Sequence, residues 1–260
     1  MLFMRIIFAT FGGPEQKYYD AVERICAQAK TFNLFDEIIG YTDKDLINDA
    51  EFWEKHKDFF EAYPKGYGYW LWKPYIQHKL LQRLDEGDIV VYADAGCELR
   101  PKRIGRMHEY FDMINGSDKG IVGITLGFDE RHWTKMDVFQ QLDCKQFLQD
   151  KYQIIATAFV YKKCANTVAI MDEWYKHSCN YHLITDHPSV LPNADGFIEH
   201  RHDQSLFSLL MKKYGFVQIG FEVEINMKVP FWARRNFSKQ TLIFNDEQAD
   251  LAPDKNWKKF

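Results

Sequence analysis

Asp94 is the residue whose surroundings most favour chemistry. It directly follows the apolar run 89–93 and precedes two small residues, Ala95 and Gly96. A short run rich in β-branched residues predicts a buried strand, and open α/β sheets bind ligands at the C-terminal ends of their strands. A carboxylate at this edge can hold a divalent cation or a ribose hydroxyl, whereas in the alternative Asp94 caps the next turn. Glu98, four residues further on, is a candidate second metal ligand.

A second candidate segment spans residues 66–74, with the sequence Gly-Tyr-Gly-Tyr-Trp-Leu-Trp-Lys-Pro. Trp70 and Trp72 offer flat apolar faces to a base or a sugar ring. Lys73 can neutralise a diphosphate as a point charge, and the helix expected from Pro74 presents free backbone N–H groups to an anion. The alternative is a hydrophobic hairpin that caps the core, with Lys73 in solvent.

A third candidate is the run Glu-His-Arg-His-Asp-Gln at residues 199–204. Asp203 and Gln204 begin a predicted helix and are expected to face a substrate. In the alternative, Asp203 only supplies the acidic first turn that complements the helix dipole. His200 and His202 suggest a metal site, but they are two positions apart and straddle the junction between a loop and the helix.

These side chains need a framework of strands and helices to bring them together. Apolar runs predict strands at 5–10, 36–42, 89–93, 120–126, 153–161 and 216–223. Helical spacing predicts helices from Pro14 toward residue 30 and at 46–62, 74–85, 104–114, 135–147, 167–178 and 202–214. The order of strand, helix and strand at the start favours parallel pairing in a doubly wound α/β sheet. The irregular stretch 180–199 is too long for an ordinary connection, so we expect a lid over the substrate.

Composition excludes several classes of protein. A chain of 260 residues can bury one large core, and a net charge of −4 gives no attraction to nucleic acid. The five cysteines are odd in number and lack metal-finger spacing, which favours a reducing, cytoplasmic setting. The apolar N-terminus is too short for a signal peptide. Phosphate-loop, dinucleotide-binding, nucleophile-elbow and zinc-protease motifs are absent from the sequence, against kinase, dehydrogenase, esterase and zinc-protease functions.

Together these parts resemble a GT-A-fold glycosyltransferase. The first strand, the run Val91-Tyr-Ala-Asp94-Ala-Gly96 in place of an Asp-x-Asp motif, the 66–74 segment and the run 202–210 are similar to viral and capsule-cluster sugar transferases. The resemblance covers roughly residues 3–225. It implies an α/β fold with a GT-A-like (Rossmann-like), mostly parallel central sheet flanked by helices. It also implies a single domain over 1–225, with 226–260 as a basic, aromatic C-terminal extension that packs on it.

The resemblance implies transfer of a sugar, typically a hexose, from a nucleotide-diphosphate donor to a hydroxyl of a glycan or glycoconjugate, as in polysaccharide biosynthesis. A UDP-sugar is the favoured donor. Asp203 and Gln204 would be catalytic; Asp203 would be the base of an inverting enzyme, whereas a retaining enzyme would not need that base. Thr157 and His202 would lie on the acceptor side. The residues expected to bind the nucleotide-sugar are Thr10, Phe11, Tyr41, Trp70, Trp72, Lys73, Asp94, Ala95 and Gly96.

A divalent cation, Mn²⁺ or Mg²⁺, is the cofactor that the resemblance implies, with Asp94 as its ligand. Gly96 occupies the position of the second aspartate of the family's Asp-x-Asp motif, which usually coordinates the metal. Asp94 therefore holds the cation with fewer protein ligands, or Glu98 or a histidine substitutes, or metal dependence is weak. The expected partners are the donor and the acceptor, with no nucleic acid and with peripheral membrane contact through the C-terminal tail.

Two rival functions stay open at this point. A glycoside hydrolase that uses two carboxylates would release free sugar without an acceptor and would bind no nucleotide. A non-catalytic carbohydrate-binding protein would need only the aromatic residues and would tolerate the loss of Asp94.

Overall fold

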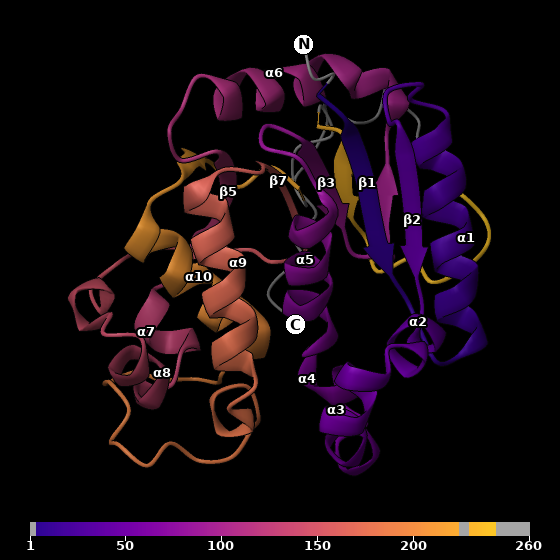
Figure 1. Ribbon diagram of the computed structural model, residues 1–260. Helices are drawn as coiled ribbons and strands as arrows, with labels where there is room; N and C mark the ends of the chain where they lie inside the picture. The colour runs from indigo at the N-terminus through magenta and orange to yellow at the C-terminus, as the bar shows by residue number, and fades with distance from the viewer. Residues whose placement is uncertain (1–3, 224–228, 243–260) are drawn as a thin grey trace.

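A seven-stranded sheet forms the centre of the computed structural model, which describes residues 4–223 and 229–242 (Figure 1). Its strands lie in the order β2-β1-β3-β7-β5-β6, with β8 beside β5. They are β1 Ile6–Phe11, β2 Glu37–Tyr41, β3 Ile89–Ala93, β5 Ile121–Leu126, β6 Gln153–Ile154, β7 Ala158–Lys162 and β8 Val217–Ile219. Strands β1, β2, β3, β5 and β8 run in one direction, and β6 and β7 run in the other. The predicted α/β class, with a mostly parallel central sheet flanked by helices, is confirmed.

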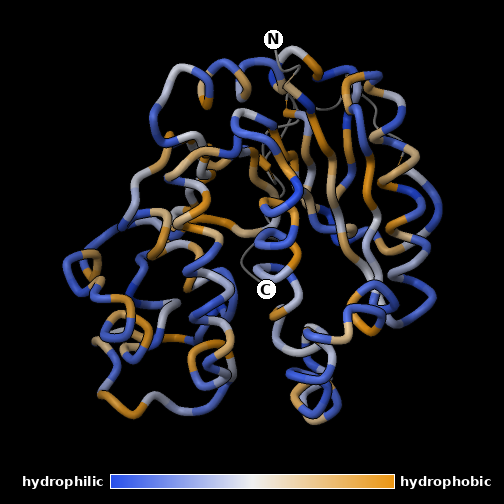
Figure 2. Tube along the Cα trace, in the orientation of Figure 1, coloured by the Kyte–Doolittle hydropathy of each residue, from blue (hydrophilic) through white to orange (hydrophobic). Residues whose placement is uncertain are grey.

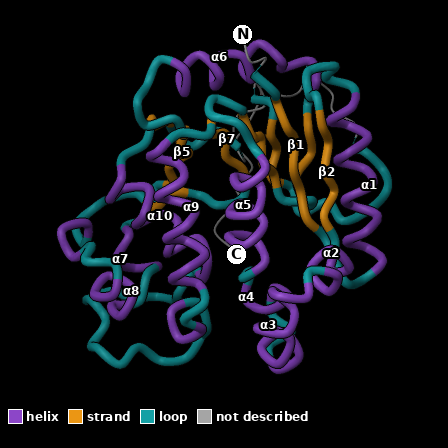
Figure 3. The backbone as a smooth tube through the Cα atoms, viewed as in Figure 1, coloured by secondary structure: helices purple, strands orange, loops and turns teal. Residues whose placement is uncertain are grey.

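Helices cover both faces of the sheet (Figure 3). The helices are α1 Gln16–Lys30, α2 Asp43–Asn48, α3 Ala50–Ala62, α4 Gly66–Tyr69, α5 Trp72–Arg83, α6 Ile104–Asn115, α7 Glu130–Trp133, α8 Met136–Gln141, α9 Ala165–Ser178 and α10 His202–Tyr214. Short 3₁₀ turns are η1 Pro101–Arg103, η2 Lys145–Phe147 and η3 Tyr181–Leu183. Helices α1 and α6 pack in one apolar cluster, and α3, α5, α9 and α10 pack in the other.

The alternation of side chains along the strands divides the core into these two clusters. In β1, Ile7, Ala9 and Phe11 belong to the cluster that contains α5, whereas Phe8 belongs to the cluster that contains α1. All five residues of β3 are buried, because helices cover both of its faces. The central strands are accordingly the most continuously hydrophobic part of the trace (Figure 2).

Three predicted elements are divided in the structure. The predicted helix 46–62 begins as the last turn of α2 and continues as α3, where Asp49 Oδ1 accepts a hydrogen bond from Phe52 N at 3.2 Å and so caps the new helix. The predicted helix 135–147 becomes α8 followed by η2. The predicted strand 153–161 becomes β6 and β7, interrupted around Ala156 and Thr157.

The C-terminal segment 229–242, here called the strap, packs on the rest of the chain. It contains β9 Phe231–Ala233, which pairs antiparallel with β4 Cys97–Leu99. Most of the predicted tail, residues 226–228 and 243–260, lies outside the described residues, and so does the membrane contact expected of it. In the described ranges, no helix has the length and apolarity required to cross a bilayer, and the five cysteines are all free thiols.

Candidate functional site

A cavity of about 580 Å³ opens at the C-terminal edge of the sheet. Strands β1 and β3 end at its floor, and α10 begins beside it. Its walls come from segments far apart in the sequence. The lining residues are Phe11–Glu15, Tyr18, Pro64, Gly66, Tyr67, Trp70, Trp72, Lys73, Asp94–Cys97, Ala156, Thr157 and Arg201–Gln204, with Ala233, Arg235 and Phe237 of the strap. This volume and position suit a small-molecule ligand bound where strand order reverses in an α/β sheet.

Lys73 lies between two aspartates at the base of this cavity. Its Nζ atom is 3.0 Å from Asp94 Oδ1 and 3.4 Å from Asp203 Oδ2. It also donates to the main-chain oxygen of Ala156 at 3.2 Å, and Tyr92 donates its hydroxyl to Asp94 Oδ1 at 2.7 Å. Because the ammonium is buried against these groups, the alternative of a hairpin with Lys73 in solvent is excluded.

The charges of this group shift each other's protonation. Burial by itself lowers the pKa of Lys73, but the adjacent Asp203 and Asp94 carboxylates raise it above its usual value, so the ammonium persists at neutral pH. Burial is the main cause that raises the pKa of Asp203 to about 6, with Asp94 adding to it and Lys73 opposing it. Asp203 is therefore a carboxylate that gains and releases a proton close to neutral pH, as a general acid or base must.

The aromatic wall of the cavity is built on a left-handed backbone. Five successive residues, Gly66 to Trp70, have φ between +48° and +69°. Left-handed geometry costs each non-glycine residue about 1–2 kcal/mol, and strain of this kind concentrates at binding sites. Gly66 has no alternative, because a Cβ there would lie 2.5 Å from the Trp70 ring. The segment stacks Trp70 on His202, with ring centroids 5.2 Å apart, and leads directly into Lys73.

Gln204 binds the segment that joins β6 and β7. Its Oε1 accepts from Ala156 N at 3.1 Å, and its Nε2 donates to Gln153 Oε1 at 2.8 Å. Gln153 in turn donates to the fully buried Glu130. Since Lys73 holds the carbonyl of Ala156, the two side chains bind both main-chain polar groups of this residue, which explains why the predicted single strand breaks there.

Most of the residues predicted to bind or react line this one cavity. They are Phe11, Trp70, Trp72, Lys73, Asp94, Ala95, Gly96, Thr157, His202, Asp203 and Gln204. Thr10 and Tyr41 do not line it. Thr10 is fully buried and points to the face opposite Phe11, as strand alternation requires. Tyr41 ends the neighbouring strand β2, where its ring is partly buried against the core.

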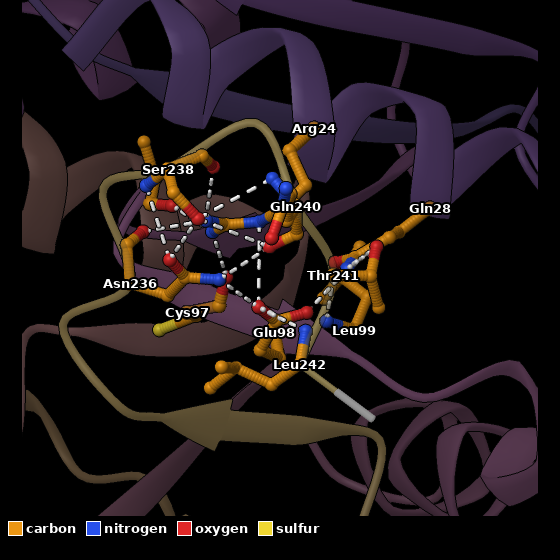
Figure 4. A network of polar contacts seen from close by, with 11 residues as sticks. Arg24, Gln28, Cys97, Glu98, Leu99, Asn236, Ser238, Gln240, Thr241 and Leu242 are labelled. Carbon is orange, nitrogen blue, oxygen red and sulfur yellow. Dashed lines mark hydrogen bonds and ion pairs between the residues drawn. The ribbon is translucent and has the colours of Figure 1, made fainter. Parts of the chain in front are cut away.

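Glu98 is placed as a structural residue and not as a metal ligand. Its fully buried carboxylate accepts from the side-chain amides of Gln28 and Asn236, and its Oε1 lies 3.5 Å from Arg24 Nε (Figure 4). Arg24 also donates to four main-chain carbonyls, those of Ala95, Cys97, Asn236 and Ser238. This Arg24–Glu98 pair fastens the strap to β4 and α1, because strap atoms contact both side chains.

The two histidines of the 199–204 run bind the main chain. His200 Nε2 donates to Leu183 O at 2.7 Å, and its Nδ1 accepts from Lys135 N at 3.4 Å. His202 Nδ1 donates to Ile184 O at 2.8 Å, and burial lowers the pKa of His202 to about 4. Within the described ranges, no three His, Cys, Asp or Glu side chains gather as ligands of a metal ion would. With an ammonium between the two aspartates, the donor set does not fit a divalent cation.

The segment 180–199 does not form the expected lid. None of its residues lines the cavity. The side chains of Lys135 and Asp137 hold it beside α8 through hydrogen bonds to its main chain. Buried Lys135 donates its Nζ to the carbonyls of His182, Thr185 and His187, and burial lowers the pKa of Lys135 to about 8. Asp137 accepts from the amides of Val190 and Leu191 at 2.7 and 2.9 Å. These contacts give the loop an internal structure beside α8.

Lys135→Met is expected to lower the free energy of unfolding by about 3 kcal/mol, because three main-chain carbonyls, that of the buried Thr185 among them, would lose their shared donor. The urea midpoint measures the loss, and proteolysis within 182–191 should accelerate. Lys145→Met, at an exposed lysine of η2, is the matched control and should stay within about 0.5 kcal/mol of the wild type. Equal midpoints for the two variants would contradict the anchoring role of Lys135.

Several cavity residues have no counterpart among the predicted ones. Arg201 lies within the predicted run 199–204 and Tyr67 within the aromatic segment 66–74, but neither carried a predicted role. Arg235 and Phe237 reach the cavity from the strap, more than 200 positions after β1. No local pattern marks these last two, since their places depend on the pairing of β9 with β4.

No protein-family model matches the chain, and no curated protein matches it. Among solved structures, it is similar to a glycosyltransferase involved in glycosylation of the major capsid of PBCV-1, with 9% identity, 84% of this chain and 81% of that chain covered, and a TM-score of 0.43. Mouse xyloside xylosyltransferase 1 has 9% identity, coverages of 84% and 85%, and a TM-score of 0.42. The galactosyltransferase LgtC with donor and acceptor sugar analogues has 15% identity, coverages of 83% and 73%, and a TM-score of 0.41. These likenesses are distant, and the chemistry of this chain follows from its own residues.

Proposed function

We propose that this protein is a GT-A-like glycosyltransferase that moves a sugar, a hexose in the simplest case, from a nucleotide-diphosphate donor to a hydroxyl of a glycan or glycoconjugate. The observation that carries the proposal is the junction of Lys73, Asp94 and Asp203 with an aromatic wall in one cavity at the C-terminal edge of the sheet. Such a cavity offers flat surfaces for a base or sugar ring, cations for a diphosphate and a carboxylate for proton transfer.

The cavity residues divide naturally between leaving group and acceptor. In an inverting transfer, the acceptor oxygen bonds to the anomeric carbon, the bond from that carbon to the diphosphate breaks, and Asp203 takes the hydroxyl proton. Its pKa of about 6 leaves it ionised and able to accept that proton at neutral pH. Arg201 and Arg235 line the same cavity and supply positive charge toward the departing diphosphate, while Lys73 neutralises Asp94 and Asp203. Thr157 and His202 complete the acceptor side, and Gln204 holds the peptide of Ala156.

The favoured donor is a UDP-sugar, because the sequence motifs resemble those of sugar transferases. The corresponding role is polysaccharide biosynthesis. The five free thiols support a reducing compartment, the cytoplasm.

A glycoside hydrolase is the second candidate, because two carboxylates, Asp94 and Asp203, line the cavity and one has a raised pKa. The ammonium of Lys73 between them disfavours it, since one of the pair would have to donate a proton as an acid. A hydrolase would release free sugar from a glycoside without a nucleotide. A carbohydrate-binding protein would bind glycans through the aromatic wall alone and would turn over neither substrate.

The direct test is a thermal-shift screen with UDP-, GDP-, dTDP- and CMP-sugars, each with EDTA and with Mn²⁺. A donor at about 100 times its dissociation constant should add roughly 2.7 kcal/mol to the free energy of unfolding. The nucleosides without phosphate are the matched control and should give a smaller shift. If no nucleoside-diphosphate sugar raises the melting temperature in any arm, the proposed donor site is wrong.

A further inference from the structure

The side-chain position of Gly96 is filled by the strap. A Cβ at Gly96 would lie 3.0 Å from the Phe237 ring and 3.3 Å from Arg235 Cα. The main-chain oxygen of Gly96 also accepts from Asn236 N at 2.9 Å. A side chain at this position would press on the strap, which the buried Arg24–Glu98 pair fastens in place, so the packing favours glycine. Glycine supplies no second carboxylate beside Asp94.

An ammonium already lies where a cation would bridge the remaining carboxylates. Lys73 Nζ is 3.0 Å from Asp94 and 3.4 Å from Asp203, and only about 4% of its side chain is exposed. The third carboxylate of the cavity, Glu15, is paired with Lys17 at 2.8 Å. A divalent cation held by Asp94 and Asp203 would lie against the Lys73 ammonium, and like charges at such a distance repel strongly away from bulk water.

Two arginines from separate segments line the cavity. Arg201 precedes α10; its guanidinium carbon lies 4.3 Å from the centre of the Trp133 ring, its Nη2 atom lies 2.9 Å from Glu199 Oε1, and about 31% of the side chain is exposed. Arg235 comes from the exposed part of the strap. A guanidinium presents a planar set of donors that matches phosphate oxygens, so this pair can bind a diphosphate directly.

We propose that this site binds the diphosphate of its donor without a divalent cation: Lys73 takes the place of the metal between Asp94 and Asp203, and Arg201 and Arg235 bind the phosphates. The proposal rests on the proposed function, because it concerns the same donor site. Lys73 neutralises the two carboxylates so that they do not repel the diphosphate, while the arginines supply the attraction.

The first experiment uses the full chain and measures calorimetric binding of UDP, GDP and inorganic pyrophosphate, with EDTA and with Mn²⁺. The affinity of the wild type should change by less than about twofold between the two conditions. Binding that requires Mn²⁺ would overturn this inference and leave the proposed function intact. Absence of binding by every probe in both conditions would count against the donor site itself.

Arg235→Gln should weaken binding of the same probes by about tenfold or more, because it removes a charge-assisted contact to phosphate. Arg234→Gln is its matched control: Arg234 is also exposed on the strap, but it stacks on Trp232 at 4.2 Å and does not line the cavity. Equal affinities for the two variants would overturn the role given to Arg235.

Lys73→Gln gives the sharpest result, because it removes the ammonium and leaves two carboxylates free. Affinity in EDTA should fall by about tenfold or more, and Mn²⁺ should restore a large part of it by occupying the vacated position. Wild-type affinity of this variant in EDTA would overturn the role of Lys73. Should the variant fail to fold, the wild-type comparison and the Arg235 and Arg234 pair still decide the question.

Discussion

Asp203→Asn is expected to lower the rate of sugar transfer by about a hundredfold or more, while donor affinity and melting temperature stay near wild-type values. The carboxylate is buried at the cavity wall, where an amide of the same shape fits. The backbone contact that Trp174 Nε1 makes to Asp203 O, at 2.9 Å, does not depend on the side chain. Lys73 keeps its contacts with Asp94 and Ala156.

The raised pKa of Asp203 predicts the pH dependence of both activity and stability. Transfer should rise as pH increases through about 6, because the base must be ionised, and the residual rate of the Asn variant should lack that step. The stability that protonated Asp203 contributes is fully present below the ordinary pKa of 3.8 and is lost as pH rises through about 6. At pH 7 this contribution is absent, so the Asn variant has little to lose.

Rate, donor affinity and melting temperature should be measured together for Asp203→Asn. Asp112→Asn, at an exposed carboxylate of α6, is the control and should match the wild type in all three. A variant that melts early but transfers sugar at the wild-type rate would reduce Asp203 to a helix-start residue. An unchanged pH profile together with near-normal transfer would favour a retaining reaction that needs no base.

Arg24→Met should have the largest effect on stability, lowering the free energy of unfolding by about 3–5 kcal/mol. The substitution leaves the Glu98 charge buried without its cation and removes the donor to four main-chain carbonyls. Since two of those carbonyls belong to the strap, we also expect the strap to detach and donor affinity to fall. Urea denaturation gives the free energy, and nucleotide binding gives the second effect.

The same variant separates a structural Glu98 from a metal-binding one. The loss of stability should be equal in EDTA and in Mn²⁺, because the Arg24–Glu98 pair requires no metal. Lys30→Met, at the exposed end of α1, is the matched control and should change stability by less than about 0.5 kcal/mol. A wild-type urea midpoint for Arg24→Met would show that the pair does not fasten the strap.

The sequence was most informative where a candidate residue lies at the boundary of an element. Asp94 directly follows β3, and Lys73 and Asp203 lie in the first turns of α5 and α10, so prediction of these elements also placed the three residues at one edge of the sheet. Thr10 shows the limit of that reasoning, because membership of a strand does not fix the face, and alternation sends its side chain away from Phe11.

Two other features could not be predicted from local pattern. The partnership of Glu98 with Arg24 and the strap joins three distant segments, so no spacing within the sequence indicates it. The left-handed segment 66–70 contains three aromatic residues that disfavour this backbone intrinsically, and surrounding packing overrides their preference. The two glycines indicated a bend, but not five successive left-handed residues.

The strap has a consequence for the order in which the protein becomes active during its synthesis. Arg24 emerges from the ribosome early, yet its partners Asn236 and Ser238 follow 212 and 214 residues later. Until Asn236 and Ser238 have been synthesised, Arg24 and Glu98 lack their hydrogen bonds to the strap, and the cavity lacks the wall that carries Arg235 and Phe237. Contacts between residues so far apart in the sequence can form only after both residues have been synthesised. A nascent chain can thus assemble much of the sheet and its helices while still unable to bind a donor, and binding competence follows the synthesis of the strap.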